Sequence, residues 1–171
     1  MKRIIATLLV AVLMVGNLPS VMANGGGGGY DYIPEYTEGC FNYIVSYDEA
    51  TILSVEKSVV GDITVPDTLG GYPVVSINSY AFQNCAGLTS VTIPDSVSYI
   101  GYYAFQDCTS LTRVNIPVYA MQIVQGTFYG CTSLEEVTIS ESVRNIGSSA
   151  FQGCTSLTNI AIPDTVTNID A

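Results

Sequence analysis

Residues 88–108 read LTSVTIPDSVSYIGYYAFQDC, and this pattern recurs along the chain with a period of 23 residues. The phenylalanine, cysteine and leucine of the unit keep that spacing without insertion from Ile77 onward. Their positions are Phe82, Phe105, Phe128 and Phe151; Cys85, Cys108, Cys131 and Cys154; and Leu88, Leu111, Leu134 and Leu157. A fixed period of this length is typical of a solenoid, in which each unit buries its apolar face against its neighbours. We therefore expect these three columns to form the core.

Each unit predicts one strand and one turn. The Leu-x-x-Val-x-Ile part alternates, so its apolar side chains should point inward from a strand, and the following proline ends the strand because it has no N–H to donate. The Ala-Phe-x-x-Cys part has helical spacing but is too short for a stable helix, so we expect one helical or 3₁₀ turn on the convex side. The expected strands are residues 60–65, 88–93, 111–116, 134–139 and 157–162.

The region before the first repeat predicts a cap. Residues 41–47 alternate strongly, Asp48 and Glu49 suggest a turn, and residues 51–56 resume a strand-like run. Terminal units of a solenoid need a polar cover, so we predict an N-terminal β-hairpin cap. The predicted division is a cap over 40–59 and a repeat array over 60–171, of which the last repeat is incomplete.

The N-terminal segment predicts secretion. Lys2 and Arg3 precede a 12-residue apolar run, and Val21 and Ala23 occupy the −3 and −1 positions of a small-residue cleavage site. A membrane anchor is the weaker interpretation, because about 20 apolar residues are needed to span a bilayer. We predict a signal peptide over 1–23, a glycine-rich flexible linker over 24–39, no membrane span after cleavage, and an extracellular location, in solution or at the cell surface.

The composition excludes several function classes. The chain carries 15 acidic and 5 basic residues, a net charge of −10, and without Lys2 and Arg3 the balance is three bases against 15 acids, or −12. Nucleic-acid binding needs clustered Lys and Arg, so we predict none. Histidine is absent, which removes the commonest metal ligand and the usual general base. We predict no enzyme activity, no cofactor and no metal site.

The Ile-Pro-Asp-Ser-Val, Ile-Gly, Ala-Phe and Cys-Thr-Ser-Leu pieces of the unit resemble the BspA-like class of leucine-rich repeats, over roughly residues 41–171. This resemblance implies a leucine-rich-repeat solenoid, mostly β. It also implies a secreted or surface protein of bacteria that binds a protein, a glycoprotein or the host matrix and is not a catalyst. The third unit departs from the pattern at Ala120, Val124, Thr127 and Ser140.

Two sets of residues that recur at the repeat spacing, the cysteines and the acids after the strands, could bind a metal. Each set also has a structural explanation. Metal motifs place cysteines two to four residues apart, whereas stacked neighbours could form disulfides in a secreted protein. We favour small buried side chains and expect at least three of the four thiols to be free; Cys40 lies outside the register and makes the count odd. The acids that follow the strands could bind calcium, but an acidic residue directly after a strand is more simply explained as a turn residue. They are Asp67, Asp95, Glu141 and Asp164.

Exposed aromatic residues are the best candidates for ligand binding, because tyrosine combines an apolar body with a polar tip. The alternative is that some of them pack on the cap or on one another. The candidates are Tyr80, Tyr99, Tyr102, Tyr103, Tyr119 and Met121, together with a mixed-charge spot at Arg113 and Glu136 on the concave face. The rest of that face is small or polar: Ser90, Thr92, Asn115, Thr138, Asn159 and Ala161.

These observations predict a secreted binding module, with a structural spacer or an N-terminal fragment of a larger secreted protein, carrying a separate catalytic region, as the alternative. The last unit lacks its Ala-Phe-x-x-Cys turn. Nothing is predicted to stack on its core layer, and its strand would leave an unpaired edge. We therefore expect this end to fray from Leu157 or to self-associate.

Overall fold

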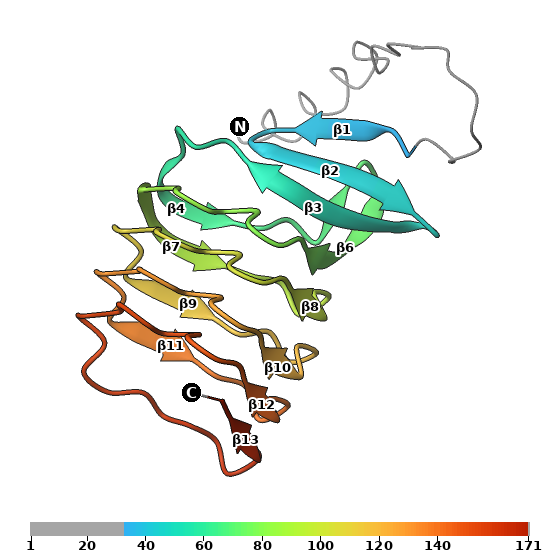
Figure 1. The fold of residues 1–171 in the computed structure, drawn as a ribbon. Helices are drawn as coiled ribbons and strands as arrows, with labels where there is room; N and C mark the ends of the chain where they lie inside the picture. The colour runs from blue at the N-terminus through green and yellow to red at the C-terminus, as the bar shows by residue number, and fades with distance from the viewer. Residues whose placement is uncertain (1–32, 171) are drawn as a thin grey trace, which may run out of the picture.

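The computed structural model describes residues 33–170, which wind into a solenoid of stacked coils (Figure 1). The predicted fold class is confirmed, since this part of the chain is mostly strand and contains no helix. The signal peptide predicted over 1–23 lies outside the described residues. The strands are β1 (Glu35–Glu38), β2 (Phe41–Ser46), β3 (Glu49–Val55), β4 (Val60–Thr64), β5 (Thr68–Leu69), β6 (Tyr72–Ile77), β7 (Gly87–Thr92), β8 (Tyr99–Ile100), β9 (Arg113–Asn115), β10 (Gln122–Ile123), β11 (Glu136–Thr138), β12 (Asn145–Ile146) and β13 (Asn168–Ile169).

The Leu-x-x-Val-x-Ile parts build one side of the solenoid as a parallel sheet, in the order β11-β9-β7-β4. Equivalent residues of the repeat are partners: Val91 pairs with Val114, and Val114 with Val137. All three valines are buried. The register of the sheet is therefore the register of the repeat, because a shift by one residue would turn every valine to solvent.

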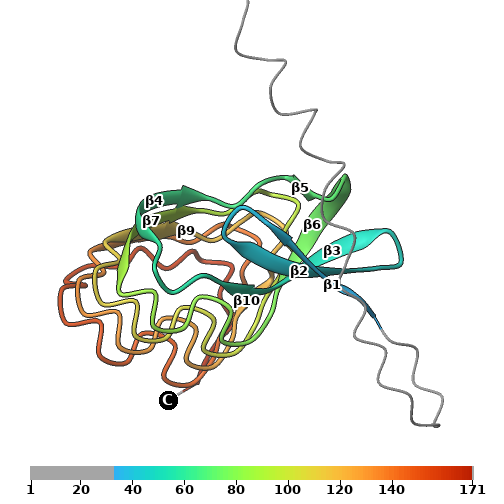
Figure 2. The same cartoon turned by 90° about the horizontal axis from the view of Figure 1, so that it is seen from above.

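A second side carries short strands that the sequence analysis did not predict. The recurring isoleucine places a buried residue there in every coil but the last, where Ile169 is exposed. Ile77 pairs with Ile100, and Ile123 pairs with Ile146. Strands β10, β12 and β13 form a parallel sheet, and β8 pairs with β6. In the view along the stack, the coils overlie one another, with β4, β7 and β9 on one side and β6 and β10 on another (Figure 2).

The third side of the solenoid consists of isolated turns. The prediction of a helical or 3₁₀ turn for Ala-Phe-x-x-Cys was therefore wrong. Two positions of each turn have positive φ, which a right-handed helix cannot contain. They are Tyr80 and Asn84, Tyr103 and Asp107, Gly126 and Gly130, and Ser149 and Gly153. The phenylalanine N–H groups instead donate to the next coil: Phe82 to the Ala104 carbonyl at 2.8 Å and Phe105 to the Thr127 carbonyl at 2.9 Å. The turns are thus held by their neighbours.

The phenylalanines stack into a continuous column inside the turns. Ring centroids are 4.7 Å apart between Phe82 and Phe105, 5.4 Å between Phe105 and Phe128, and 5.5 Å between Phe128 and Phe151. The first three rings are fully buried, as are Leu88, Leu111 and Leu134. Phe151 and Leu157 are only partly buried. The phenylalanine and leucine columns that the sequence predicts are fully buried in the inner coils, whereas their members in the last coil are only partly buried.

Three antiparallel strands extend the second side beyond the first coil. Strand β2 pairs with β1 and β3, and β3 runs parallel to β6. Strand β1 lies inside the segment 24–39 that is predicted as linker. Its residues are mostly exposed, with Tyr36 partly buried against the core, and its strand conformation comes from its bonds to β2.

The last coil departs from the prediction. Residues 157–162 form no strand, although they carry the Leu-x-x-Ile-x-Ile spacing of the motif. In earlier coils the residue after the valine-containing strand donates across the stack, as Ile116 does to the Thr138 carbonyl at 2.8 Å. Ile139 makes no equivalent backbone bond within the described residues. The fifth expected strand was therefore wrong. Its coil bonds to the preceding coil again from Thr165, whose hydroxyl donates to the Val143 carbonyl at 3.1 Å, and then pairs through β13.

Candidate functional site

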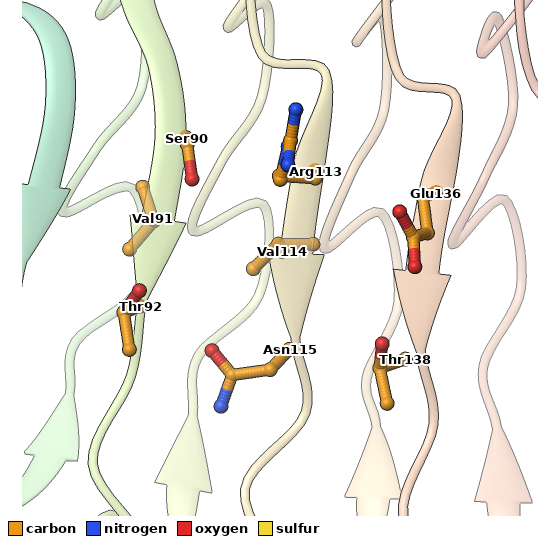
Figure 3. Close-up of a pocket in the computed structure, with 8 residues that line it drawn as sticks. All are labelled: Ser90, Val91, Thr92, Arg113, Val114, Asn115, Glu136 and Thr138. Carbon is orange, nitrogen blue, oxygen red and sulfur yellow. The ribbon is translucent and has the colours of Figure 1, made fainter.

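The outer face of the parallel sheet carries a shallow depression of about 280 Å³ over β7, β9 and β11 (Figure 3). Pairing sets its two rows of outward side chains. Arg113 stands between Ser90 and Glu136 in the first row, and Asn115 is paired with Thr138 in the second. The depression brings together six of the residues predicted for the concave face. Asn159 and Ala161 are exposed in the strandless part of the last coil and do not line it.

Arg113 and Glu136 supply the charge of this depression. They are register partners on neighbouring strands, and both are exposed. Within the described residues neither head group has a hydrogen bond or an ion pair closer than 4.0 Å. An arginine offers five donors in a planar fork and a carboxylate offers only acceptors, so the two side chains can each engage a polar ligand of opposite character.

Asn115 has a structural role that its position on the face did not reveal. Its amide oxygen accepts from the Ile93 N–H at 2.9 Å, and its amide nitrogen donates to the Ile93 carbonyl at 2.8 Å. Strand β7 ends at Thr92, and Pro94 has no N–H to continue the pairing. The Asn115 side chain therefore replaces the missing backbone partner, which leaves Arg113 and Glu136 as the available ligand groups.

The tyrosine candidates do not form a single site. Tyr80 and Tyr103 stack on the turn side, with ring centroids 5.6 Å apart and planes 3° from parallel, and Tyr103 meets Tyr129 edge to face at 6.3 Å. Tyr129 was missed by the sequence analysis. The signal was present, because Gln83, Gln106 and Gln152 occupy the same position of the other units. Stacking gives these rings a role in the fold.

The other aromatic candidates lie free at the surface. Tyr99 is on β8, Tyr102 follows that strand, and Tyr119 and Met121 lie between β9 and β10. All four are exposed and none of the three rings stacks on another aromatic ring of residues 33–170. The structure thus separates the predicted set into a stacked row on the turn side and exposed residues near the second sheet.

The cysteine column is part of the core. All five cysteines are free, and the thiols of Cys108, Cys131 and Cys154 each lie 3.0–3.1 Å from the carbonyl oxygen of the phenylalanine 26 residues earlier. Burial is the main cause that raises the pKa of Cys108 to about 12 and of Cys154 to about 11. A thiol held neutral in this way is neither a nucleophile nor a metal ligand.

One of the acids that follow the strands, Asp95, connects two coils through its side chain. Asp95 accepts from the Val118 N–H through its carboxylate at 3.3 Å, which joins one coil to the next. In residues 33–170 no three His, Cys, Asp or Glu side chains gather closely enough to hold a metal ion.

The model of the BspA type leucine-rich repeat region matches residues 60–171 in six copies. This match covers more than half of the chain. The chain belongs to the BspA-type leucine-rich-repeat family. A repeat protein of this family is consistent with a binding or a structural module.

Two solved structures support the same fold. The chain is similar to a T. pallidum leucine-rich repeat protein, with a TM-score of 0.73 and 31% identity, over 80% of this chain and 64% of that one. It is also similar to a leucine-rich repeat protein from Bacteroides ovatus, with a TM-score of 0.72 and 30% identity, over 82% and 37% of the two chains. The chain spans less than two thirds of the length of either protein. No curated protein gives a significant match.

Within this BspA-type repeat array, the third unit differs from the other units in its exposed residues. Val118, Tyr119 and Met121 stand where other units carry acids, serines, threonines or an arginine. Among residues 33–170 there is also no helix with the length and apolar character needed to cross a membrane.

Proposed function

We propose that the chain is a secreted or cell-surface binding module that mediates protein–protein contact or adhesion to host or matrix, without catalysis. The observation that carries this proposal is the depression on β7, β9 and β11, where Arg113 and Glu136 are adjacent, exposed and without partners among residues 33–170. Charged groups placed on a rigid sheet in this way fix the orientation and specificity of a partner rather than transform it.

The residue types of the depression support a non-catalytic role. Ser90 is the only hydroxyl in the first row, and its register partner Arg113 cannot take up a proton. A serine nucleophile needs an adjacent base, and the sequence contains no histidine. Binding is therefore the chemistry that these side chains support.

The extracellular location rests on residues 1–23, whose basic start, apolar run and small-residue cleavage site are typical of a signal peptide. Free, buried cysteines are compatible with that location, because a thiol enclosed in the core is protected from oxidation. Expression in a bacterial host, followed by N-terminal sequencing of the exported chain, tests it. A mature N-terminus at Asn24 is expected, and retention of the full-length chain in the cytoplasm would contradict export.

Binding is tested with the purified chain on arrays of immobilised extracellular-matrix proteins and glycoproteins. Arg113→Ala and Glu136→Ala should each weaken binding by about tenfold, the usual effect of removing a central charged contact. Arg144→Ala is the matched control, since Arg144 is also exposed but lies outside the depression. The proposal fails if no array protein binds, or if the control weakens binding as much as Arg113→Ala.

The alternative function is a structural spacer or an N-terminal fragment of a larger secreted protein with a separate catalytic region. Its support is that the chain spans only 64% and 37% of the two similar structures. The nucleotide sequence beyond the Ala171 codon distinguishes the two functions, because further repeats, an anchor or a catalytic domain would favour the alternative. Self-association through the C-terminal coil stays a prediction, which sedimentation at high protein concentration tests.

A further inference from the structure

The corner between β9 and β10 carries an exposed apolar patch, which we define as Val118, Tyr119 and Met121. Their side chains are 48%, 64% and 68% exposed. The equivalent residues of the neighbouring units are polar: Asp95, Ser96 and Ser98 in the second unit, and Glu141, Ser142 and Arg144 in the fourth. The apolar patch is therefore a local departure from an otherwise polar edge of the solenoid.

The apolar patch does not serve the core of its own coil. Ile116 and Ala120, on either side of Val118 and Tyr119, are the residues that turn inward, and they are buried. The backbone is closed by a turn in which the Ala120 N–H donates to the Pro117 carbonyl at 3.1 Å. Buried anchors and a closed turn fix the backbone of the three exposed residues, which lowers the entropic cost of binding.

Carboxylates border the apolar patch on both neighbouring coils. The Asp95 carboxylate accepts from the Val118 N–H at 3.3 Å. On the other side, the Ser140 hydroxyl donates to the Pro117 carbonyl at 3.2 Å, which places Glu141, the next residue, beside Val118. Arg144 is the one nearby cation of the described residues, and its guanidinium already donates to the Glu141 carbonyl at 2.8 Å.

We propose that the apolar patch docks a short segment of another protein in which an apolar side chain is flanked by lysine or arginine. The apolar residues would bury that side chain, while Asp95 and Glu141 attract the flanking charges, in a chain whose net charge is −10. Three side chains expose only a few hundred square ångströms, well below the roughly 800 Å² per partner of a standard interface. The area therefore suits a peptide segment better than a stable dimer of this chain. This surface shares no residue with the depression on the parallel sheet.

The test uses three fluorescein-labelled nonapeptides that share a central Leu-Phe-Leu and differ only in their flanks of lysine, glutamate or serine. Fluorescence anisotropy with the purified chain should give the tightest binding for the lysine-flanked peptide, by about tenfold over the glutamate-flanked one, and this preference should fall as salt is added. The triple variant Val118→Asp, Tyr119→Ser and Met121→Ser copies the second unit and should lose about tenfold in affinity.

Two further variants separate the contributions. Asp95→Asn combined with Glu141→Gln should remove the preference for lysine flanks while keeping the apolar contact. Tyr47→Asn is the matched control, because Tyr47 is a 97% exposed tyrosine in the β2–β3 turn, and it should leave binding unchanged. Arg113→Ala should also leave it unchanged, so that this proposal and the proposed function can fail separately.

Several results would overturn the proposal. They are equal affinity for the three peptides, no loss in a triple variant that melts like the wild type, or no measurable binding of the lysine-flanked peptide. A wild-type chain that dimerises while the triple variant is monomeric would assign the apolar patch to contacts between copies, which also overturns it.

Discussion

Residues 88–93 and residues 157–162 occupy the same positions of the repeat, yet only the first stretch becomes a strand. Strand β7 has six residues and is paired on both sides, with β4 and with β9. Strands β9 and β11 have three residues each, and the equivalent stretch of the last coil has none. Pairing on the parallel sheet therefore shortens with distance from the cap.

The comparison teaches that the repeat motif alone does not make a strand in this solenoid. Leu88 is fully buried between coils, whereas Leu157 and Ile160 are only partly buried. In the described chain a single coil lies against residues 157–162, and these residues do not pair with β11. The residues there, Asn159 and Ala161, also have low strand propensity. Neighbouring coils supply what the local sequence does not.

The largest expected effect concerns the phenylalanine column. Phe105→Ala should lower the free energy of unfolding by about 3–5 kcal/mol, because it leaves a cavity between two stacked rings. Phe151→Ala should cost about half as much or less, since that ring is partly exposed and stacks on one ring only. Urea denaturation measures both, with Thr92→Ala as an exposed control. Equal losses for the two phenylalanines would contradict the difference between inner and last coils.

The next effect concerns a close contact between stacked coils. Gly126 has φ +64°, and a Cβ there would overlap the Tyr103 ring of the preceding coil. Gly39 has φ +60° but open space around it. Gly39→Ala should therefore cost only the backbone strain of about 1 kcal/mol, and Gly126→Ala about 1–3 kcal/mol more. Similar shifts in melting temperature would show that stacking leaves room at Gly126.

A pH effect should follow from the buried thiols. Burial raises the pKa of Cys108 to about 12 and of Cys154 to about 11, above the ordinary value of 9.0. The folded chain keeps protons that the unfolded chain releases, so this contribution to stability is complete below pH 9 and decreases as the pH rises toward 11–12. The melting temperature should fall over that range, and Cys108→Ala should make the fall less steep. An unchanged slope in the variant would exclude Cys108 as a cause.

The smallest effect is a difference in thiol reactivity along the column. Cys40 is half-buried, Cys154 is 9% exposed, and Cys108 and Cys131 are fully enclosed. Alkylation of the native chain followed by mass spectrometry should label Cys40 first and Cys154 next, and the inner thiols only after denaturation. Early labelling of Cys108 together with Cys154 would show that the inner coils open as readily as the last one.

The sequence predicted the middle coils well because the period places the same apolar residue at each core position. Strand alternation also placed Arg113 and Glu136 on one outward face, since their strands share the register of the repeat. The turn conformation was not predictable from the Ala-Phe-x-x-Cys spacing, which fits a helical turn equally well. The better signal was glycine at the two positive-φ positions of the unit, Gly126 at the first and Gly130 and Gly153 at the second.

Other features depend on contacts that no single unit contains. The bonds of Asn115 to Ile93 arise only when two coils are stacked. The pairing of β1 with β2 likewise orders a polar segment that reads as a linker in isolation. Tyr129 stands out in the sequence as the one aromatic residue at a glutamine position, but its contact with Tyr103 arises only when the coils are stacked.

Amide hydrogen exchange of the purified chain tests most directly whether strand pairing on the parallel sheet is lost in the last coil. The amides of Gly87–Thr92 are paired with two neighbouring strands and should be strongly protected. Those of residues 158–162 make no backbone hydrogen bond in the structure and should exchange close to the rate of an unfolded peptide. Protection in residues 158–162 equal to that in Gly87–Thr92 would contradict the account, because the last copy of the motif would then be paired as fully as an inner strand.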